Sequence, residues 1–146
     1  VEVIKAARAV AASANIPLVL NARTDVYLHP DGDGATLFKQ AVHRATAYLG
    51  AGADCIYPIG LKDRATIAGL VREIRAPMNI MAGPNAPSIA ELEEIGVARV
   101  TFGTALMRAV LPLVRRMAQE LFQSGASAAL AQTEFTHAEV NHLFER

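Results

Sequence analysis

Cysteine and aromatic residues are scarce in this 146-residue sequence. Cys55 is the only cysteine, tryptophan is absent, and aromatic residues make up 5% of the chain. A single cysteine excludes an internal disulfide and a metal site built from several cysteines, and it favours a reducing compartment. Because Cys55 lies within a short apolar stretch, we interpret it as a small buried hydrophobe and not as a catalytic thiol.

The sequence also lacks a charge imbalance and a long hydrophobic run. Fourteen Lys and Arg residues balance fourteen Asp and Glu residues, so the net charge gives no support to nucleic acid or an anionic membrane as a partner. No apolar run reaches the roughly 18 residues of a membrane span, and no signal peptide opens the sequence. We therefore expect a cytoplasmic protein with neither partner, whose substrate is bound by individual side chains.

The remaining composition is that of a packed globular domain. Hydrophobic residues make up 52% and charged residues 19% of the chain, which is long enough for a substantial core. The sequence opens at Val1, inside an amphipathic helical pattern that has neither an initiating Met nor a capping residue before it. We expect that further natural sequence precedes it.

Strand-like and helix-like segments alternate along the chain. Strands are predicted over 18–21, 55–57, 78–81 and 99–102, and helices over 1–14, 35–50, 63–74, 88–95 and 105–124, with a short last helix from 137. Repeated strand and helix pairs with short loops predict an α/β fold with a parallel sheet and right-handed crossovers. Four such pairs form either a small open sheet or half of a (β/α)8 TIM barrel. Functional-looking loops after the strands favour the half-barrel.

A polar string, Asn21-Ala22-Arg23-Thr24-Asp25, follows the apolar run over 18–20. Ligands of parallel sheets lie beyond the carboxyl ends of the strands, where we expect Arg23. Its guanidinium matches a carboxylate or phosphonate with two parallel hydrogen bonds. Asn21 lies two residues back, on the same side of the strand, and could support the ligand. The alternative is a structural ion pair of Arg23 with Asp25 or with a nearby loop carboxylate.

Other polar residues favour structural or solvent-exposed positions. Asp54 precedes its strand and is expected on the stability face of a barrel. His29 lies in a turn-rich loop beside the polar string and is interpreted as a solvent-exposed histidine. The five-residue step from His137 to His142 turns the two rings apart on a helix, which argues against a metal site there.

Three strings of the sequence together resemble the isocitrate lyase/phosphoenolpyruvate mutase superfamily. They are the polar string over 21–25, Ala-Gly-Ala-Asp over 51–54, and Glu-Leu-Glu-Glu-Ile-Gly-Val-Ala-Arg-Val over 91–100. The resemblance covers about residues 1–109, and within the superfamily it is greatest to the phosphonomutase-like branch.

This resemblance implies a modified (β/α)8 barrel with a Mg²⁺-dependent site. It also implies cleavage or formation of C–C or P–C bonds in small oxo- or hydroxy-acids, and homo-oligomers that exchange a C-terminal helix. By its position the chain would be the last four strand and helix units over 1–109, followed by C-terminal helices over 110–146. The metal ligands of the family lie in the first half, so we expect this stretch to be inactive alone.

The resemblance implies that Arg23 contacts the acid group of the substrate and that Asn79 lies near a substrate contact, and the positions of Asn21, Thr24 and Asp25 beside Arg23 suggest their roles. Arg23, Asn21 and Asn79 are expected to bind the substrate, and Thr24 and Asp25 to orient those groups without touching it. The strand that contains Asn79 ends in Met-Ala-Gly-Pro over 81–84, which we expect to lack a polar contact that lyases of the family make.

Two other interpretations of the sequence remain open. The chain could be a non-catalytic half-barrel that binds itself or another protein, because an unpartnered half exposes sheet edges and an apolar face. It could also be part of a phosphate-binding barrel of another superfamily, an idea that depends on Gly103 and Thr104 before a helix N-terminus.

Overall fold

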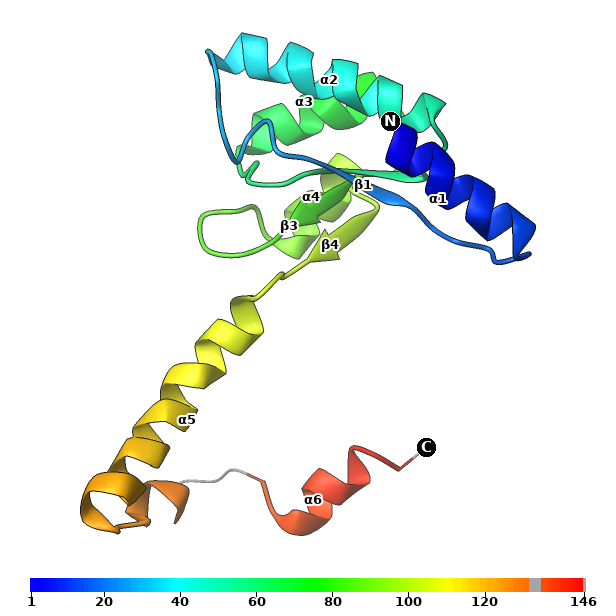
Figure 1. The fold of residues 1–146 in the computed structure, drawn as a ribbon. Helices are drawn as coiled ribbons and strands as arrows, with labels where there is room; N and C mark the ends of the chain where they lie inside the picture. Colours follow the sequence, from blue (N-terminus) through cyan, green and yellow to red (C-terminus); the bar gives the residue numbers. More distant parts are fainter. Residues whose placement is uncertain (132–134, 146) are drawn as a thin grey trace. The chain divides into compact units, whose positions relative to one another are not determined.

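Within the described residues, four strands alternate with helices (Figure 1). The computed structural model describes residues 1–131 and 135–145. Its elements are α1 (Glu2–Ser13), β1 (Asn21–Thr24), α2 (Gly34–Gly50), β2 (Cys55–Pro58), α3 (Arg64–Ile74), β3 (Asn79–Met81), α4 (Ile89–Ile95), β4 (Arg99–Thr101), α5 (Ala105–Ser124), η1 (Ala128–Ala131) and α6 (His137–His142). The chain divides into two compact units, Val1–Gly103 and Thr104–Arg146. The predicted α/β class is confirmed.

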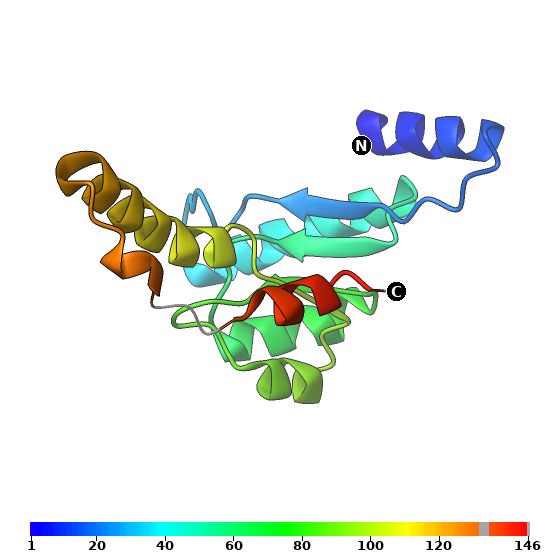
Figure 2. The same ribbon diagram turned by 90° about the horizontal axis from the view of Figure 1, so that it is seen from below.

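The strands that the structure describes pair in parallel. β1 pairs with β2 from Asn21 beside Cys55 onward, and Figure 2 shows these two strands side by side and pointing the same way. β3 pairs with β4 from Asn79 beside Arg99 onward. An isolated parallel bridge between Ile56 and Met78 places β2 next to β3. The spatial order of the strands in the first unit is therefore their order in the sequence.

β1 begins later than the sequence predicts. The apolar run was expected to be the strand, yet Leu18 and Val19 are 39% and 68% exposed and precede it. Hydrogen bonding between β1 and β2 begins at the Leu20 carbonyl, which accepts the backbone N–H groups of Asp54 and Cys55. Leu18 and Val19 lie before this point and have no partner in β2. The expectation that Arg23 lies beyond its strand is wrong, since Arg23 is the third residue of β1.

One face of the strands packs under the helices. Met78 and Ile80 are buried in a cluster with side chains of α2, α3 and α4, and Ala22 and Ile56 are buried in a second cluster with α2. The helical members of the two clusters are Leu37, Ala41, Ala45, Ile67, Leu70 and Leu92. Figure 1 shows α2 and α3 on one side of β1. Because side chains alternate along a strand, the residues between these apolar ones lie on the opposite face.

The predicted helix starts are confirmed by side-chain caps. Asp63 accepts the Thr66 backbone N–H at 2.8 Å and begins α3. Ser88 begins α4 with the predicted reciprocal capping box to Glu91, and Thr136 caps α6. Each cap satisfies a backbone donor that the first turn of a helix leaves without a partner.

Arg8 and Asp54 tie α1 to the amino ends of β1 and β2. Arg8 donates from Nη1 to the Leu18 carbonyl at 2.7 Å and from Nε to the Gly52 carbonyl at 3.1 Å, and its Nη2 contacts the Asp54 carboxylate. The Leu20 N–H donates to the same carboxylate at 2.7 Å. The hydrogen bond from the Leu20 N–H is the largest cause that lowers the pKa of Asp54, and the bond from Arg8 to the same carboxylate lowers it further. Asp54 thus has the structural position that the sequence predicts.

The second unit contains α5, which spans the predicted range and includes Pro112. α5 buries none of its residues, and its C-terminus is closed by Gly125 in the left-handed region (φ 68°), where glycine is favoured. Among the described residues, no helix is long and apolar enough to cross a membrane.

Replacing Asp54 tests this connection. Because the pKa of Asp54 is lowered on folding, its carboxylate stabilises the fold above its ordinary pKa of 3.8 and loses that effect as the pH falls through the folded-state pKa. Asp54→Asn should lower the unfolding midpoint at neutral pH by a few degrees, from a loss of about 1 kcal/mol for this half-exposed group. The difference from the wild type should vanish in acid.

Thermal unfolding followed by circular dichroism against pH measures this difference. Asp31→Asn is the matched control, because the Asp31 carboxylate accepts no hydrogen bond from the part of the chain that the structure describes. Equal midpoints for Asp54→Asn and the wild type at neutral pH would contradict the assignment.

Candidate substrate-binding site

Polar side chains occupy alternating positions on the strand face that the helices leave uncovered. We call this set the polar face, and its members are Asn21, Arg23, Tyr57, Asn79, Arg99 and Thr101. In the strand register Arg23 lies beside Tyr57, and Asn79 lies beside Arg99. The bridge between β2 and β3 continues this row from Tyr57 to Asn79. Four strands therefore contribute one polar or cationic side chain each to a single row.

Arg23 is held by Asp25 on one edge of its guanidinium. Nε donates to Asp25 Oδ1 at 2.6 Å and Nη2 donates to Oδ2 at 3.0 Å, while the two side chains remain 51% and 41% exposed. This bidentate bond uses two of the five guanidinium N–H groups. The other edge, formed by Nη1 and Nη2, remains available for a second oxyanion, since it has the same two-donor geometry. The pair with Asp25 therefore orients Arg23 and leaves it able to bind a ligand.

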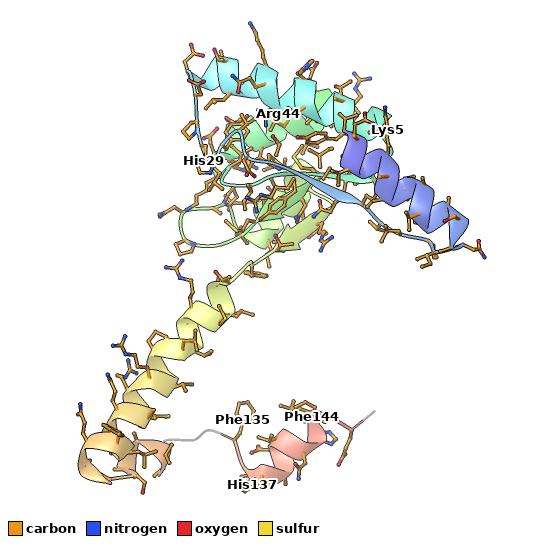
Figure 3. The ribbon with its side chains drawn as sticks, viewed as in Figure 1. Lys5, His29, Arg44, Phe135, His137 and Phe144 are labelled. Atoms are coloured by element: carbon orange, nitrogen blue, oxygen red, sulfur yellow. The ribbon has the colours of Figure 1, made fainter. Side chains whose placement is uncertain are left out.

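The electrostatics of this pair favour its charged form. The hydrogen bond from Arg23 is the largest cause that lowers the pKa of Asp25, with further lowering by His29 and Arg44. Figure 3 labels His29, which follows β1, and Arg44, which lies on α2. The hydrogen bond to Asp25 also raises the pKa of Arg23. Both groups are ionised throughout the physiological range.

Asn79 is fully buried, and neither its amide nitrogen nor its amide oxygen has a hydrogen-bond partner within the described ranges. Asn21 Oδ1 and Thr101 Oγ1 on the same face are likewise buried and unpaired. A buried polar group without a partner is costly, at about 1 to 3 kcal/mol. A cluster of such groups beside an arginine is typical of a ligand site.

The structure brings the predicted substrate-binding residues Arg23, Asn21 and Asn79 to one face of the sheet. Asp25 contacts Arg23, as expected of an orienting group. Thr24 does not join them, because alternation places it on the helix-covered side, where its hydroxyl is buried without a partner.

Gly103 lies in the left-handed region and close to Met81. It adopts φ 52°, and a Cβ there would lie 3.3 Å from Met81 Sδ. Thr104, the N-cap of α5, forms no side-chain cap hydrogen bond. Neither observation adds support to the phosphate-site interpretation.

Three polar-face residues were missed from the sequence, namely Tyr57, Arg99 and Thr101. The available signal was the alternation already used to relate Asn21 to Arg23. Applied to the strand over 99–102, it places Arg99 and Thr101 on one side and Val100 on the other.

Mg²⁺ usually keeps several waters and takes one or two protein carboxylates as ligands. No group of three or more His, Cys, Asp or Glu side chains is placed to hold a metal in the described part of the chain.

The fold and this face together define a class, the α/β proteins whose parallel strands present a row of polar and cationic side chains on one face. A sequence model described as phosphoenolpyruvate phosphomutase matches residues 1–122. The chain belongs to this family, within the phosphoenolpyruvate mutase/isocitrate lyase superfamily.

Solved structures of the superfamily share the fold. A protein of Burkholderia cenocepacia that is provisionally assigned as a lyase/mutase superposes with a TM-score of 0.77 at 34% identity, over 97% of this chain and 50% of that one. A 2,3-dimethylmalate lyase superposes with a TM-score of 0.76 at 23% identity, over 96% of this chain and 48% of that one. These neighbours are TIM-barrel-like.

Curated relatives match over a smaller share of their length. An uncharacterized protein of Mycobacterium tuberculosis is 37% identical over 62% of this chain and 33% of its own length. A 2-methylisocitrate lyase of Aeropyrum pernix is 28% identical over 85% of this chain and 42% of its own length. The chain thus spans about a third to two fifths of these relatives.

Carbon NMR titration of the aspartate carboxyls tests the Arg23–Asp25 pair. The pKa of Asp25 should lie below its ordinary value of 3.8, and Arg23→Gln should return it toward that value, because the variant removes both the hydrogen bond and the positive charge. Asp33 is the internal control: hydrogen bonds from Thr36 lower its pKa, so it should titrate alike in both proteins. An Asp25 titration that Arg23→Gln leaves unchanged would refute the pair.

Proposed function

We propose that the intact protein is a Mg²⁺-dependent lyase or mutase that cleaves or forms a C–C or P–C bond of a small oxo- or hydroxy-acid. Its relatives include a 2-methylisocitrate lyase and a 2,3-dimethylmalate lyase. The observation that carries the proposal is the free Nη1/Nη2 edge of Arg23 on the same face as the buried, unpaired Asn79.

Arg23 is suited to bind the acid group of the substrate. Its free edge would accept a carboxylate or phosphonate through two charge-assisted hydrogen bonds, and Asp25 fixes the plane of the guanidinium. Cleavage of a bond next to a carbonyl develops negative charge on an oxygen, and a fixed guanidinium stabilises such charge best where water is limited. The Asn79 amide nitrogen would donate to a carbonyl or hydroxyl oxygen of the same molecule, and its amide oxygen would accept from a hydroxyl group.

Mg²⁺ would supply a Lewis acid for this reaction, and its ligands would come from residues outside this chain. We propose accordingly that residues 1–109 are the last four strand and helix units of a (β/α)8 barrel. In the described structure β1 and β4 each pair with one strand only, so each has an edge that a further strand would complete. This arrangement would make the isolated chain inactive.

We also propose that the intact protein is a cytoplasmic homo-oligomer in which the helices over 110–146 pass between subunits. The exposed apolar side chains of α5 support this assembly, because water-exposed apolar residues along one helix favour association. They also favour the second candidate function, a non-catalytic half-barrel whose role is oligomerisation. Lyase or mutase activity of the full-length protein would distinguish the enzyme from the non-catalytic half-barrel.

The assay uses the full-length protein with Mg²⁺ and oxaloacetate, 2-methylisocitrate or 2,3-dimethylmalate, and measures release of the cleaved acids. Arg23→Lys should lower kcat/KM by about 10- to 100-fold, because a lysine retains the charge but loses the two-donor edge. Arg64→Lys, which changes an exposed arginine of α3, should stay within about twofold.

Equal kcat/KM for Arg23→Lys and the wild type would contradict the role of Arg23. Turnover by the isolated 146-residue chain would contradict the half-barrel assignment. Absence of turnover in the full-length protein with every acid, together with a stable oligomer by light scattering, would favour the non-catalytic alternative.

A further inference from the structure

Gly60 lies in the loop that follows β2, against the turn that follows β1. The two strands end side by side, with Thr24 beside Pro58 in the register. Gly60 adopts a φ of 88°, and a Cβ built on it would lie 3.0 Å from the Tyr27 carbonyl oxygen and 3.1 Å from the Leu28 backbone nitrogen. At these distances the neighbouring atoms must shift, and both belong to the backbone. The close approach and the left-handed backbone therefore favour glycine at this position.

Both loops are anchored in the core on either side of this contact. Val26, which precedes Tyr27, is 4% exposed, and Leu61, which follows Gly60, is 5% exposed. Val26 and Leu61 belong to the same buried cluster, and Tyr27 packs against it. Because close-packed side chains resist displacement, neither loop can move away freely. A side chain at position 60 would therefore push on the turn after β1.

This turn is built on Asp25, the residue that holds Arg23. The Asp25 backbone carbonyl accepts the N–H groups of Leu28 and His29, both at 3.0 Å, while its carboxylate accepts the two hydrogen bonds from Arg23. The Leu28 nitrogen, on which a Cβ at position 60 would press, is thus bonded directly to Asp25. A bidentate pair depends on the position and plane of both groups, so a small displacement of the turn would loosen it.

We propose that Gly60 is a positioning residue for Arg23. By leaving room for the peptide that joins Tyr27 and Leu28, it lets the turn close on Asp25, which then holds the guanidinium in the plane that binds an acid. Gly60 exerts this role through the turn and needs no contact of its own with the substrate. The inference rests on the proposed function of Arg23 and extends the site to the loop that follows β2.

Gly60→Ala in the full-length protein tests this role, and Gly52→Ala is the matched control. Gly52 also has a positive φ, 103°, but it precedes β2, and the atoms nearest to a Cβ there belong to the flexible Arg8 side chain, at 3.5 Å. The hydrogen bond from Arg23 is the largest cause that lowers the pKa of Asp25. Carbon NMR titration should therefore show this pKa rising toward its ordinary value of 3.8 in Gly60→Ala and unchanged in Gly52→Ala.

Turnover gives a second measurement, with an acid that the full-length protein cleaves. Gly60→Ala should lower kcat/KM by about tenfold, because a misplaced binding group stabilises the transition state less well. Gly52→Ala should change kcat/KM by less than about twofold.

A variant that combines Gly60→Ala with Arg23→Gln shows whether Gly60 acts through the ion pair. Arg23→Gln alone already removes the hydrogen bond that lowers the pKa of Asp25, so the addition of Gly60→Ala should raise that pKa no further. An additional rise as large as that in Gly60→Ala alone would overturn the proposal, because the effect would not depend on the pair.

The other outcomes separate this inference from the proposed function. An Asp25 pKa that Gly60→Ala leaves unchanged, or that Gly52→Ala raises as much, would overturn the role of Gly60. Unchanged kcat/KM in Gly60→Ala, where Arg23→Lys loses activity, would do the same. Wild-type kcat/KM in Arg23→Lys would instead overturn the proposed function, and the titration of Asp25 would still decide the role of Gly60.

A second substitution keeps the test decisive should Gly60→Ala fail to fold by circular dichroism. Asparagine adopts a left-handed backbone more readily than alanine and carries a Cβ at the same position. In Gly60→Asn, a rise in the pKa of Asp25 supports the proposal, and no rise overturns it.

Discussion

Parallel pairing of neighbouring strands is the constraint on which the rest of the first unit depends. Once Asn21 lies beside Cys55 and Asn79 beside Arg99, alternation decides which side chain of every strand lies under the helices. Ala22, Ile56 and Ile80 go to that side and are buried. A shift of one residue would bury Arg23 beneath α2 and expose the core residues, so the same register that builds the core also assembles the polar face.

The two arginines of the polar face differ in whether a carboxylate neutralises them. Asp25 neutralises one edge of Arg23 and holds the guanidinium in place, whereas Arg99 has no carboxylate partner among the described residues. Asn79 lies between them in the register, and its buried amide has no hydrogen-bond partner among the described residues. An arrangement that fixes one cation and leaves a second unpaired favours a ligand that brings negative charge.

The order of helices and strands could be predicted from the sequence, because apolar periodicity and capping residues such as Ser88 are local signals. The start of β1 could not, because Leu18 and Val19 are as apolar as a buried strand and only the position of β2 decides where pairing begins. Arg23, Asn21 and Asn79 were found by their chemistry. Arg99 was missed because the alternation that relates Asn21 to Arg23 was not applied to the strand over 99–102, and its neighbours on the polar face depend on a register that no local pattern gives.

The balanced composition of the chain bears on how the polar face would select an acid. With equal numbers of acidic and basic residues, the chain has no net charge to attract an anion from a distance. Selectivity for an acid must then arise at contact, from donors that are already oriented. The bond from Arg23 to Asp25 supplies that orientation in advance, so less side-chain entropy is lost when an acid binds. Asp25, an anion within an anion-binding face, favours binding because it fixes the geometry of the cation beside it.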